Sequence, residues 1–402
     1  GSYWSESETG SINIAGQAKV ETVKTVTAST DIDGSTNKSF SSLRYDYTLS
    51  EDESQDTLTQ VREGDRQNYG YYDENNIWHM YVGLLKGVTV LEVQGSIDLD
   101  GNGAPETGLR GVYTEGTTIF DNAYKTLVEN EYAIIKGQAK VESATTVNNT
   151  TNPDGSETWS KSKLEYSYSE DGMLIGVGQG DLSSGSVTLN GIVVDYEGGR
   201  RGVTAAVDIF NNSSVSYYEA LYLNPKDWQG RVLVDWSLTT TETTNIDGSK
   251  TVTFDKRKHI YDRNTTRLIK VENTDIDPGE VTLNGVKIRY GSEAIPAVVA
   301  VWADIFGNVS ISRIEQDYLP PENWGGKIIV KKAITTTDST SIDGTTSTSI
   351  NTVEYSHEKG ILAIQAGNTT QKIYVDENGN EVKEVITYTE YGNPLKVVKT
   401  VK

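Results

Sequence analysis

Four pairs of glycines constrain this chain more than any other feature of its sequence. In each pair the second glycine follows the first by 18 residues and ends a turn of the form Asp/Asn/Ser-x-Asp-Gly. The pairs are Gly16 and Gly34, Gly137 and Gly155, Gly230 and Gly248, and Gly326 and Gly344. Because glycine supplies the positive φ that a tight turn needs, each pair predicts the base and the tip of one long hairpin. A spacing this constant indicates one structural unit that is present four times.

Alternating apolar residues predict that these units are built from strands. After Gly230, Val232, Val234, Trp236 and Leu238 fall on one face of an extended chain, and a period of two indicates a half-buried strand. The chain holds 23 Tyr among its 402 residues, and no long stretch has the 3.6-residue period of a helix. We therefore expect an all-β fold: a tandem array of four similar antiparallel β-rich units, as β-sandwiches or β-meanders, with long hairpins.

The repeated landmarks divide the chain at the opening glycines. The expected segments are a lead segment or donor strand at 1–15, repeat 1 with an insertion at 16–136, repeat 2 at 137–229, repeat 3 at 230–325 and a shortened repeat 4 at 326–402. The extra length of repeat 1 is expected in 51–65 or in 98–110. Neither end of the array carries an obvious cap, although repeat arrays bury their cores between neighbours and need caps at their ends.

The residue two positions before each opening glycine is expected to pack between repeats. These residues are Ile14, Ile135, Trp228 and Trp324. A sugar-stacking platform is the alternative interpretation of the two tryptophans. Trp78 and Trp159 are expected to be exposed and are the other candidates for stacking on sugars.

Ring side chains recur 11 and 13 residues after each turn glycine, and this regularity decides how the histidines are interpreted. The ring pairs are Tyr45 and Tyr47, Tyr166 and Tyr168, His259 and Tyr261, and Tyr355 and His357. Because His259 and His357 take positions that Tyr holds elsewhere, we expect structural rings there rather than catalytic bases or metal ligands. His79 lies outside these positions and has no partner evident in the sequence.

Charge and cysteine content exclude several classes of function. The net charge of −21 opposes binding to nucleic acid, which needs basic patches. The chain has no cysteine and three histidines, which leaves little material for nucleophilic catalysis or thiolate metal sites. No run approaches the length of a membrane span, so we expect no membrane insertion.

One segment has the spacing of a cation-binding loop. Side-chain oxygens of Asp98, Asp100 and Asn102, the carbonyl of Ala104 and the carboxylate of Glu106 alternate along a glycine-rich stretch. Hard oxygen ligands at this spacing suit calcium, and the stretch resembles the short calcium loops of bacterial extracellular β-proteins. The alternative is a Gly/Asn-rich hairpin turn. The weaker version at 376–380 is expected to be a plain turn.

Short pieces of the chain resemble the Tyr-Asp-x-x-Gly-Asn strands of YD/Rhs-like β-repeats. The pieces are Asp304-Ile-Phe-Gly-Asn-Val309, Tyr374-Val-Asp-Glu-Asn-Gly-Asn380 and Tyr388-Thr-Glu-Tyr-Gly-Asn-Pro394. The unit in this chain is several times longer than a YD repeat, so no Rhs-type cage is inferred. Thr-rich hairpins with Asp-Gly tips are also similar to those of large repetitive exoproteins, which implies an extracellular or cell-surface location.

Three functions remain open at this point. The first is a non-enzymatic structural protein, a segment or subunit of a surface filament, stalk or adhesin. Its partners would be copies of itself, joined head to tail by strand complementation. The second is a module that binds polysaccharide or another surface. The third, a carbohydrate-active enzyme, is disfavoured because acidic residues are abundant throughout the chain and single out no catalytic pair.

Overall fold

The computed structural model describes residues 1–93, 97, 99, 108–295, 297–324, 326–355, 362–366, 369–375, 381–388 and 394–401. Strands in antiparallel pairs dominate this part of the chain, and its helical elements are short 3-10 turns. The expectation of an all-β fold is therefore confirmed. The chain divides into two compact units, Gly1–Thr253 with Ala303–Ile305, and Phe254–Trp302 with Phe306–Lys402.

The described residues of the first unit form sixteen strands and three 3-10 turns. The strands are β1 (Ser2–Ile14), β2 (Gln17–Thr30), β3 (Thr36–Tyr47), β4 (Gly70–Tyr72), β5 (Trp78–Met80), β6 (Leu85–Val90), β7 (Val112–Thr117), β8 (Ala123–Ile135), β9 (Gln138–Thr151), β10 (Glu157–Tyr168), β11 (Leu174–Gln179), β12 (Gly185–Leu189), β13 (Ile192–Tyr196), β14 (Gly202–Val207), β15 (Ser213–Tyr222) and β16 (Val234–Thr244). The turns are η1 (Gln55–Thr57), η2 (Glu63–Tyr69) and η3 (Pro225–Trp228).

The second unit contains the remaining elements. They are β17 (Lys250–Tyr261), which begins in the first unit, β18 (Leu268–Asn273), β19 (Gly279–Leu283), β20 (Val286–Tyr290), β21 (Val298–Ala303), which ends in the first unit, β22 (Val309–Tyr318), η4 (Pro321–Trp324), β23 (Val330–Thr340), β24 (Thr346–Glu354), β25 (Leu362–Ala366), β26 (Thr369–Val375), β27 (Glu381–Tyr388) and β28 (Pro394–Val401). Strands β22, β23 and β24 pair in sequence order, and β25 to β28 form a separate four-stranded sheet.

The glycine pairs explain the length of the long strands. Gly16 and Gly34 have φ angles of 81° and 89° and lie in the turns at the two ends of β2. The other three pairs flank β9, β16 and β23 in the same way, and all their glycines have positive φ. A residue that has a Cβ adopts a positive φ only at a cost in conformational energy, which favours glycine in the turns at both ends of these strands. The constant spacing thus fixes the separation of the two turns that bracket each of these long strands.

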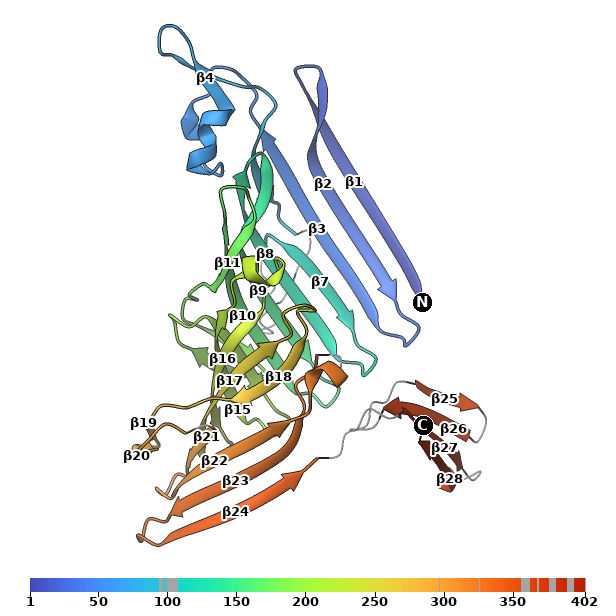
Figure 1. The fold of residues 1–402 in the computed structure, drawn as a ribbon, viewed down its shortest axis with the longest axis vertical. Helices are drawn as coiled ribbons and strands as arrows, with labels where there is room; N and C mark the ends of the chain where they lie inside the picture. The colour runs from blue at the N-terminus through green and yellow to red at the C-terminus, as the bar shows by residue number, and fades with distance from the viewer. Residues whose placement is uncertain are drawn as a thin grey trace. The chain divides into compact units, whose positions relative to one another are not determined.

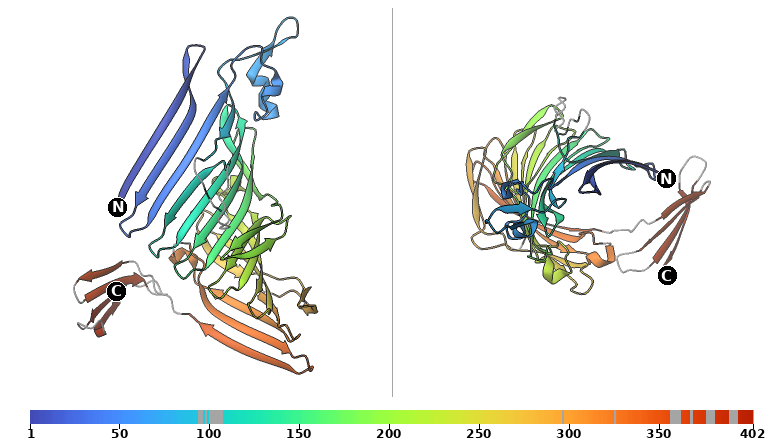
Figure 2. Two further views of the ribbon diagram at one scale, coloured as in Figure 1. Left: turned by 180° about the vertical axis from the view of Figure 1, so that it is seen from behind. Right: turned by 90° about the horizontal axis from the view of Figure 1, so that it is seen from above.

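The first unit is an antiparallel meander (Figure 1). Pairing runs in the order β1, β2, β3, β7, β8, β9, β10, β14, β15 and β16, and Figure 2 shows that this sheet is curved. We call the end of the sheet that carries the Asp-Gly turns the tip end, and the opposite end the base end. Of the two architectures expected, the meander is the one observed here.

Strands β3 and β10, which return from the first two tips, each pair with two different strands on their far side. The first half of β3 pairs with β7 and its second half with β6, and β10 divides in the same way between β14 and β11. In the second unit the last residues of β17 pair with β18. The base-half pairings share a register shift just before Tyr47, Tyr168 or Tyr261. The second ring position predicted from the sequence therefore coincides with a bulge.

Small hairpins cover one face of the tip half of the sheet. The β12–β13 hairpin contributes Val187, Leu189 and Val194 to a core with Trp159 of β10. Trp159 is only 5% exposed and stacks on Tyr196, with ring centroids 5.3 Å apart. The expectation that Trp159 is an exposed sugar-stacking residue is therefore wrong, because the small hairpin buries it.

The extra length of the first repeat lies between β3 and β6. The connection there spans residues 48–84, whereas the corresponding connections from β10 to β11 and from β17 to β18 span residues 169–173 and 262–267. The connection from β6 to β7, which contains 98–110, is similar in length to its counterparts. The inserted segment is therefore residues 48–84, which contains the expected stretch 51–65.

Candidate functional site

The inserted segment, residues 48–84, packs onto the base half of the sheet through its own apolar side chains. Leu58 and Met80 are fully buried, and together with Val61 they contact Val88 of β6 and Ile134 of β8. Figure 1 shows the segment, with its 3-10 turns and β4, at the base end of the first unit. This packing holds the segment against the sheet.

Hydrogen bonds to the main chain fix the position of the β4–β5 hairpin within this segment. Thr48 Oγ1 donates to the carbonyl oxygen of Tyr81 at 2.6 Å, and the amide of Tyr81 donates to the carbonyl oxygen of Tyr69 at 2.7 Å. The Tyr69 hydroxyl donates to the carbonyl oxygen of Leu85 at 2.5 Å, and burial raises the pKa of Tyr69 to about 12. The hairpin is therefore tied to the strands on both sides of the segment.

The turn of the hairpin is organised by one carboxylate. Asp73 Oδ1 accepts hydrogen bonds from the amides of Ile77 and Asn75 at 2.8 and 2.9 Å. Its Oδ2 lies 3.3 Å from Nε2 of His79. These contacts, with the Ile77 amide first among them, lower the pKa of Asp73. The structure thus supplies the partner for His79 that the sequence left unidentified.

The two faces of the hairpin differ sharply in burial. Trp78 and Met80 point toward the core beneath the hairpin, and Trp78 is only partly exposed, contrary to the expectation of an exposed sugar-stacking residue. Tyr71, His79 and Tyr81 lie on the opposite face, since side chains alternate along a strand. We call this second face the outer face of the hairpin.

The outer face is a continuous aromatic surface. The ring centroids of Tyr71 and His79 are 5.3 Å apart and the rings are stacked, and the Tyr71 and Tyr81 centroids are 5.7 Å apart. Tyr71 is 46% exposed and Tyr81 is 48% exposed. Ile77 is also exposed on this face. The outer face therefore presents two tyrosine rings next to the imidazole–carboxylate pair of His79 and Asp73.

Each unit also presents a long strand with one side unpaired among the described pairings. In the first unit β1 pairs only with β2, and its first eight residues are exposed on both faces. They include Tyr3, 73% exposed, and Trp4, 51% exposed. In the second unit β24 pairs only with β23 and is exposed along its whole length. Such edges are templates for pairing with another chain.

Apolar side chains recur in the Asp-Gly turns and in similar turns of both units. Exposed isoleucines occupy the second position of three Asp-Gly turns, and exposed Ile-Phe pairs occupy the turns between them; these residues are Ile32, Ile246, Ile342, Ile119, Phe120, Ile209, Phe210, Ile305 and Phe306. Asn212 Oδ1 accepts from the amide of Ile246 at 2.9 Å, and Asn308 Oδ1 does the same for Ile342. Hydrogen bonds therefore link neighbouring turns at these two places.

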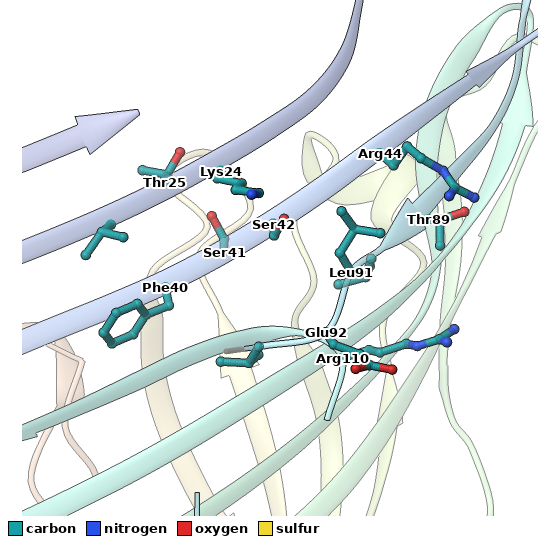
Figure 3. Close-up of a pocket in the computed structure, with 13 residues that line it drawn as sticks. Lys24, Thr25, Phe40, Ser41, Ser42, Arg44, Thr89, Leu91, Glu92 and Arg110 are labelled. Carbon is teal, nitrogen blue, oxygen red and sulfur yellow. The ribbon is translucent and has the colours of Figure 1, made fainter. Parts of the chain in front are cut away.

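A shallow depression of about 680 Å³ lies on the face of β2 and β3 shown in Figure 3. Lys24 Nζ lies 3.9 Å from Glu8, and Arg44 Nε lies 3.1 Å from Asp46, so two of its cations already have carboxylate partners. Its described lining contains no histidine. The depression offers no arrangement of nucleophile and base.

The residues predicted to hold calcium, Asp98, Asp100, Asn102, Ala104 and Glu106, lie outside the described residues, as do His357 and 376–380. Across the part of the chain that is described, no cluster of three or more His, Asp or Glu side chains is arranged to hold a metal. His259 is half-buried in β17 opposite Val271.

The residues predicted to pack between repeats are buried or partly buried. Ile14 and Ile135 are 5% and 4% exposed, Trp324 is 8% exposed, and Trp228 is half-buried in η3. A Cβ atom placed on Gly83 would lie 3.7 Å from Cγ2 of Ile14, and one on Gly172 would lie 3.6 Å from Cγ2 of Ile135. The two isoleucines thus occupy equivalent environments, and their role between repeats stays a prediction.

Sequence reasoning missed Tyr71, Asp73 and Tyr81 as a group. The sequence does contain one indication that these side chains share a face. Alternate positions before a short turn hold Tyr71 and Asp73, and alternate positions after it hold Ile77, His79 and Tyr81.

Comparison with known proteins gives no family: no family model matches the chain, and no curated protein matches it. No helix in the described ranges is long and apolar enough to cross a membrane.

Proposed function

We propose that this protein is a non-enzymatic structural protein of the cell surface or extracellular space. In this proposal it is an array of four similar units that assembles head to tail into a filament, stalk or adhesin. The observation that carries the proposal is β1, a strand from Ser2 to Ile14 that is paired along one side and exposed on both faces over most of its length. Long exposed edges of this kind are otherwise avoided because they recruit other strands.

The turn geometry identifies which groups of β1 face outward. The amide of Asp31 donates to the carbonyl oxygen of Ser35, so these two residues form a hydrogen-bonded pair between β2 and β3. Because such pairs alternate along an antiparallel ladder, the even-numbered residues of β2 before the tip turn direct their amides and carbonyls toward β1. The register then leaves the main-chain groups of Tyr3, Ser5, Ser7 and Thr9 pointing away from β2.

The same argument applies to β24. The amide of Ser341 donates to the carbonyl oxygen of Thr345, and that of Tyr355 donates to the carbonyl oxygen of Lys331. The odd-numbered residues of β24 therefore bond to β23. The main-chain groups that point outward belong to Thr346, Thr348, Ile350, Thr352 and Glu354.

Charge favours pairing between the two different edges over pairing of β1 with a second β1. A β1–β1 contact would bring Glu6 and Glu8 of one copy close to the same residues of another copy, and like charges across a ladder are destabilising. Strand β24 carries a single charged residue, Glu354, at its end. A heterologous β1–β24 contact avoids the repulsion, and repeated heterologous contacts produce chains of subunits.

Light scattering coupled to size-exclusion chromatography tests this function. The unmodified protein is expected to increase in mass with concentration, because each copy offers both edges. Ser5→Pro with Ser7→Pro removes two outward amide donors and leaves the main-chain hydrogen bonds to β2 in place, and this variant is expected to lose the growth in mass. Ser5→Ala with Ser7→Ala keeps both amides and is the matched control. An unmodified protein that stays monomeric at every concentration would refute the proposal.

A further inference from the structure

The outer face of the β4–β5 hairpin has the wrong composition for a surface whose only neighbour is water. One face of this hairpin already packs on the core through Trp78 and Met80. The other face of such a hairpin is ordinarily polar, yet here it carries Tyr71, His79 and Tyr81 as contiguous rings. A contiguous exposed apolar surface marks a contact site.

We propose that this outer face binds a neutral carbohydrate chain. A sugar ring has an apolar face of C–H groups, which stacks on an aromatic ring, and hydroxyl groups at its edge, which need hydrogen-bond partners. Tyr71 and Tyr81 offer both ring area and a hydroxyl group, and His79 adds a ring nitrogen beside Asp73.

The site is held in place before any ligand arrives. The main chain of Tyr81 is bonded on both sides, by Thr48 and by Tyr69. The turn is held by Asp73 through the amides of Asn75 and Ile77. A rigid surface loses little conformational entropy on binding, which favours affinity.

Charge selects a neutral chain over an acidic one. The inserted segment has only two basic residues, Arg62 and Arg66, against eight acidic ones: Glu51, Asp52, Glu53, Asp56, Glu63, Asp65, Asp73 and Glu74. The chain as a whole carries a net charge of −21. This field repels anionic polysaccharides. The ligand class is therefore an uncharged polysaccharide whose sugar rings stack on the aromatic side chains.

Native gel electrophoresis through soluble polysaccharides tests the proposal. The unmodified protein is run in gels that contain hydroxyethylcellulose, galactomannan, dextran or alginate, and in a gel without polymer. We expect retardation in at least one neutral polymer and none in alginate. Tyr71→Ala with Tyr81→Ala is expected to weaken binding by roughly tenfold or more, because two aromatic contacts are removed. Both side chains are largely exposed, and an unchanged melting temperature confirms that the variant folds.

The matched control removes an even more exposed ring elsewhere in the first unit. Phe210 is 66% exposed in the turn between β14 and β15, and Phe210→Ala is expected to be retarded like the unmodified protein. Absence of retardation in all three neutral polymers, or retardation that survives loss of both tyrosines, would overturn the assignment. Self-association that the two tyrosine substitutions abolish would instead identify the face as a protein contact. The Ser5→Pro, Ser7→Pro variant keeps this face, so failure of assembly and failure of carbohydrate binding are separate outcomes.

Discussion

At the scale of single residues, the same side chains perform the same task at each hairpin tip. The aspartate that precedes the glycine of each Asp-Gly turn (Asp33, Asp154, Asp247 or Asp343) accepts a hydrogen bond from the amide of the Ser or Thr two residues later, at 2.8–3.0 Å. The pKa of each of these four carboxyls is lowered by its contacts with that Ser or Thr. Turn formation therefore accounts for these four aspartates.

These carboxylates predict a loss of stability in acid. A carboxyl whose pKa is lower in the folded state than its ordinary value of 3.8 stabilises the fold above that value. The stabilisation is lost as the pH falls through the lower, folded-state pKa. Replacing all four aspartates by asparagine keeps an acceptor oxygen but removes the titration. The melting temperature of this variant is expected to fall less than that of the unmodified protein between about pH 5 and pH 2. Equal losses would show that the turn carboxylates do not contribute.

Burial predicts opposite effects for two large aromatic residues. Trp159 is 5% exposed in the core beneath the β12–β13 hairpin, whereas Phe210 is 66% exposed. Trp159→Ala is expected to lower the free energy of unfolding by about 3–5 kcal/mol, and Phe210→Ala by less than about 0.5 kcal/mol. Urea denaturation measures both. Similar effects of the two substitutions would contradict the described packing.

At the scale of elements, strand length and register are set together by the paired turns. Strand β9 lies between Gly137 and Gly155 and pairs with β8 on one side and β10 on the other. Inserting one residue would move every later side chain to the opposite face of the sheet. The constant spacing of the glycine pairs is thus a constraint on which residues reach the core.

An insertion pair tests this constraint. One threonine added between Thr145 and Thr146 in β9 is expected to cost several kcal/mol, on the order of a large core deletion, because it displaces the inward side chains that follow. One glycine added between the exposed residues Ser183 and Ser184, in the connection from β11 to β12, is expected to be nearly neutral. Thermal unfolding compares the two, and a β9 insertion as harmless as the loop insertion would show that register is not specified there.

The sequence allowed prediction of those elements whose residues carry a local conformational requirement. Positive φ at Gly34 and its equivalents, and ring positions such as Tyr166 and Tyr168, follow from turn and strand geometry alone. The burial of Trp159 was not predictable, because it depends on a small hairpin that returns from later in the chain. The outer face of the β4–β5 hairpin was missed because the sequence does not show which side of a short strand meets the core.

At the scale of the whole molecule, the expected repeats are less separate than the sequence suggests. Strand β8 precedes Gly137, pairs with β7 over its first half and pairs with β9 over its whole length. The boundary at Gly137 is therefore a tight turn within one sheet and not a linker. A sheet that grows by adding strands has no intrinsic end, which is the physical basis for expecting growth by further copies at β1 and β24.

Mixing two variants, each with one edge blocked, tests this central claim most directly. Ser5→Pro with Ser7→Pro blocks β1, and Thr348→Pro with Thr352→Pro blocks β24. Each variant alone is expected to remain monomeric by light scattering. In one variant a free β24 finds no free β1, and in the other a free β1 finds no free β24. An equimolar mixture is expected to form dimers with one copy of each variant and nothing larger. Dimers formed by either variant alone, or a mixture that stays monomeric while the unmodified protein assembles, would contradict head-to-tail pairing of these two strands.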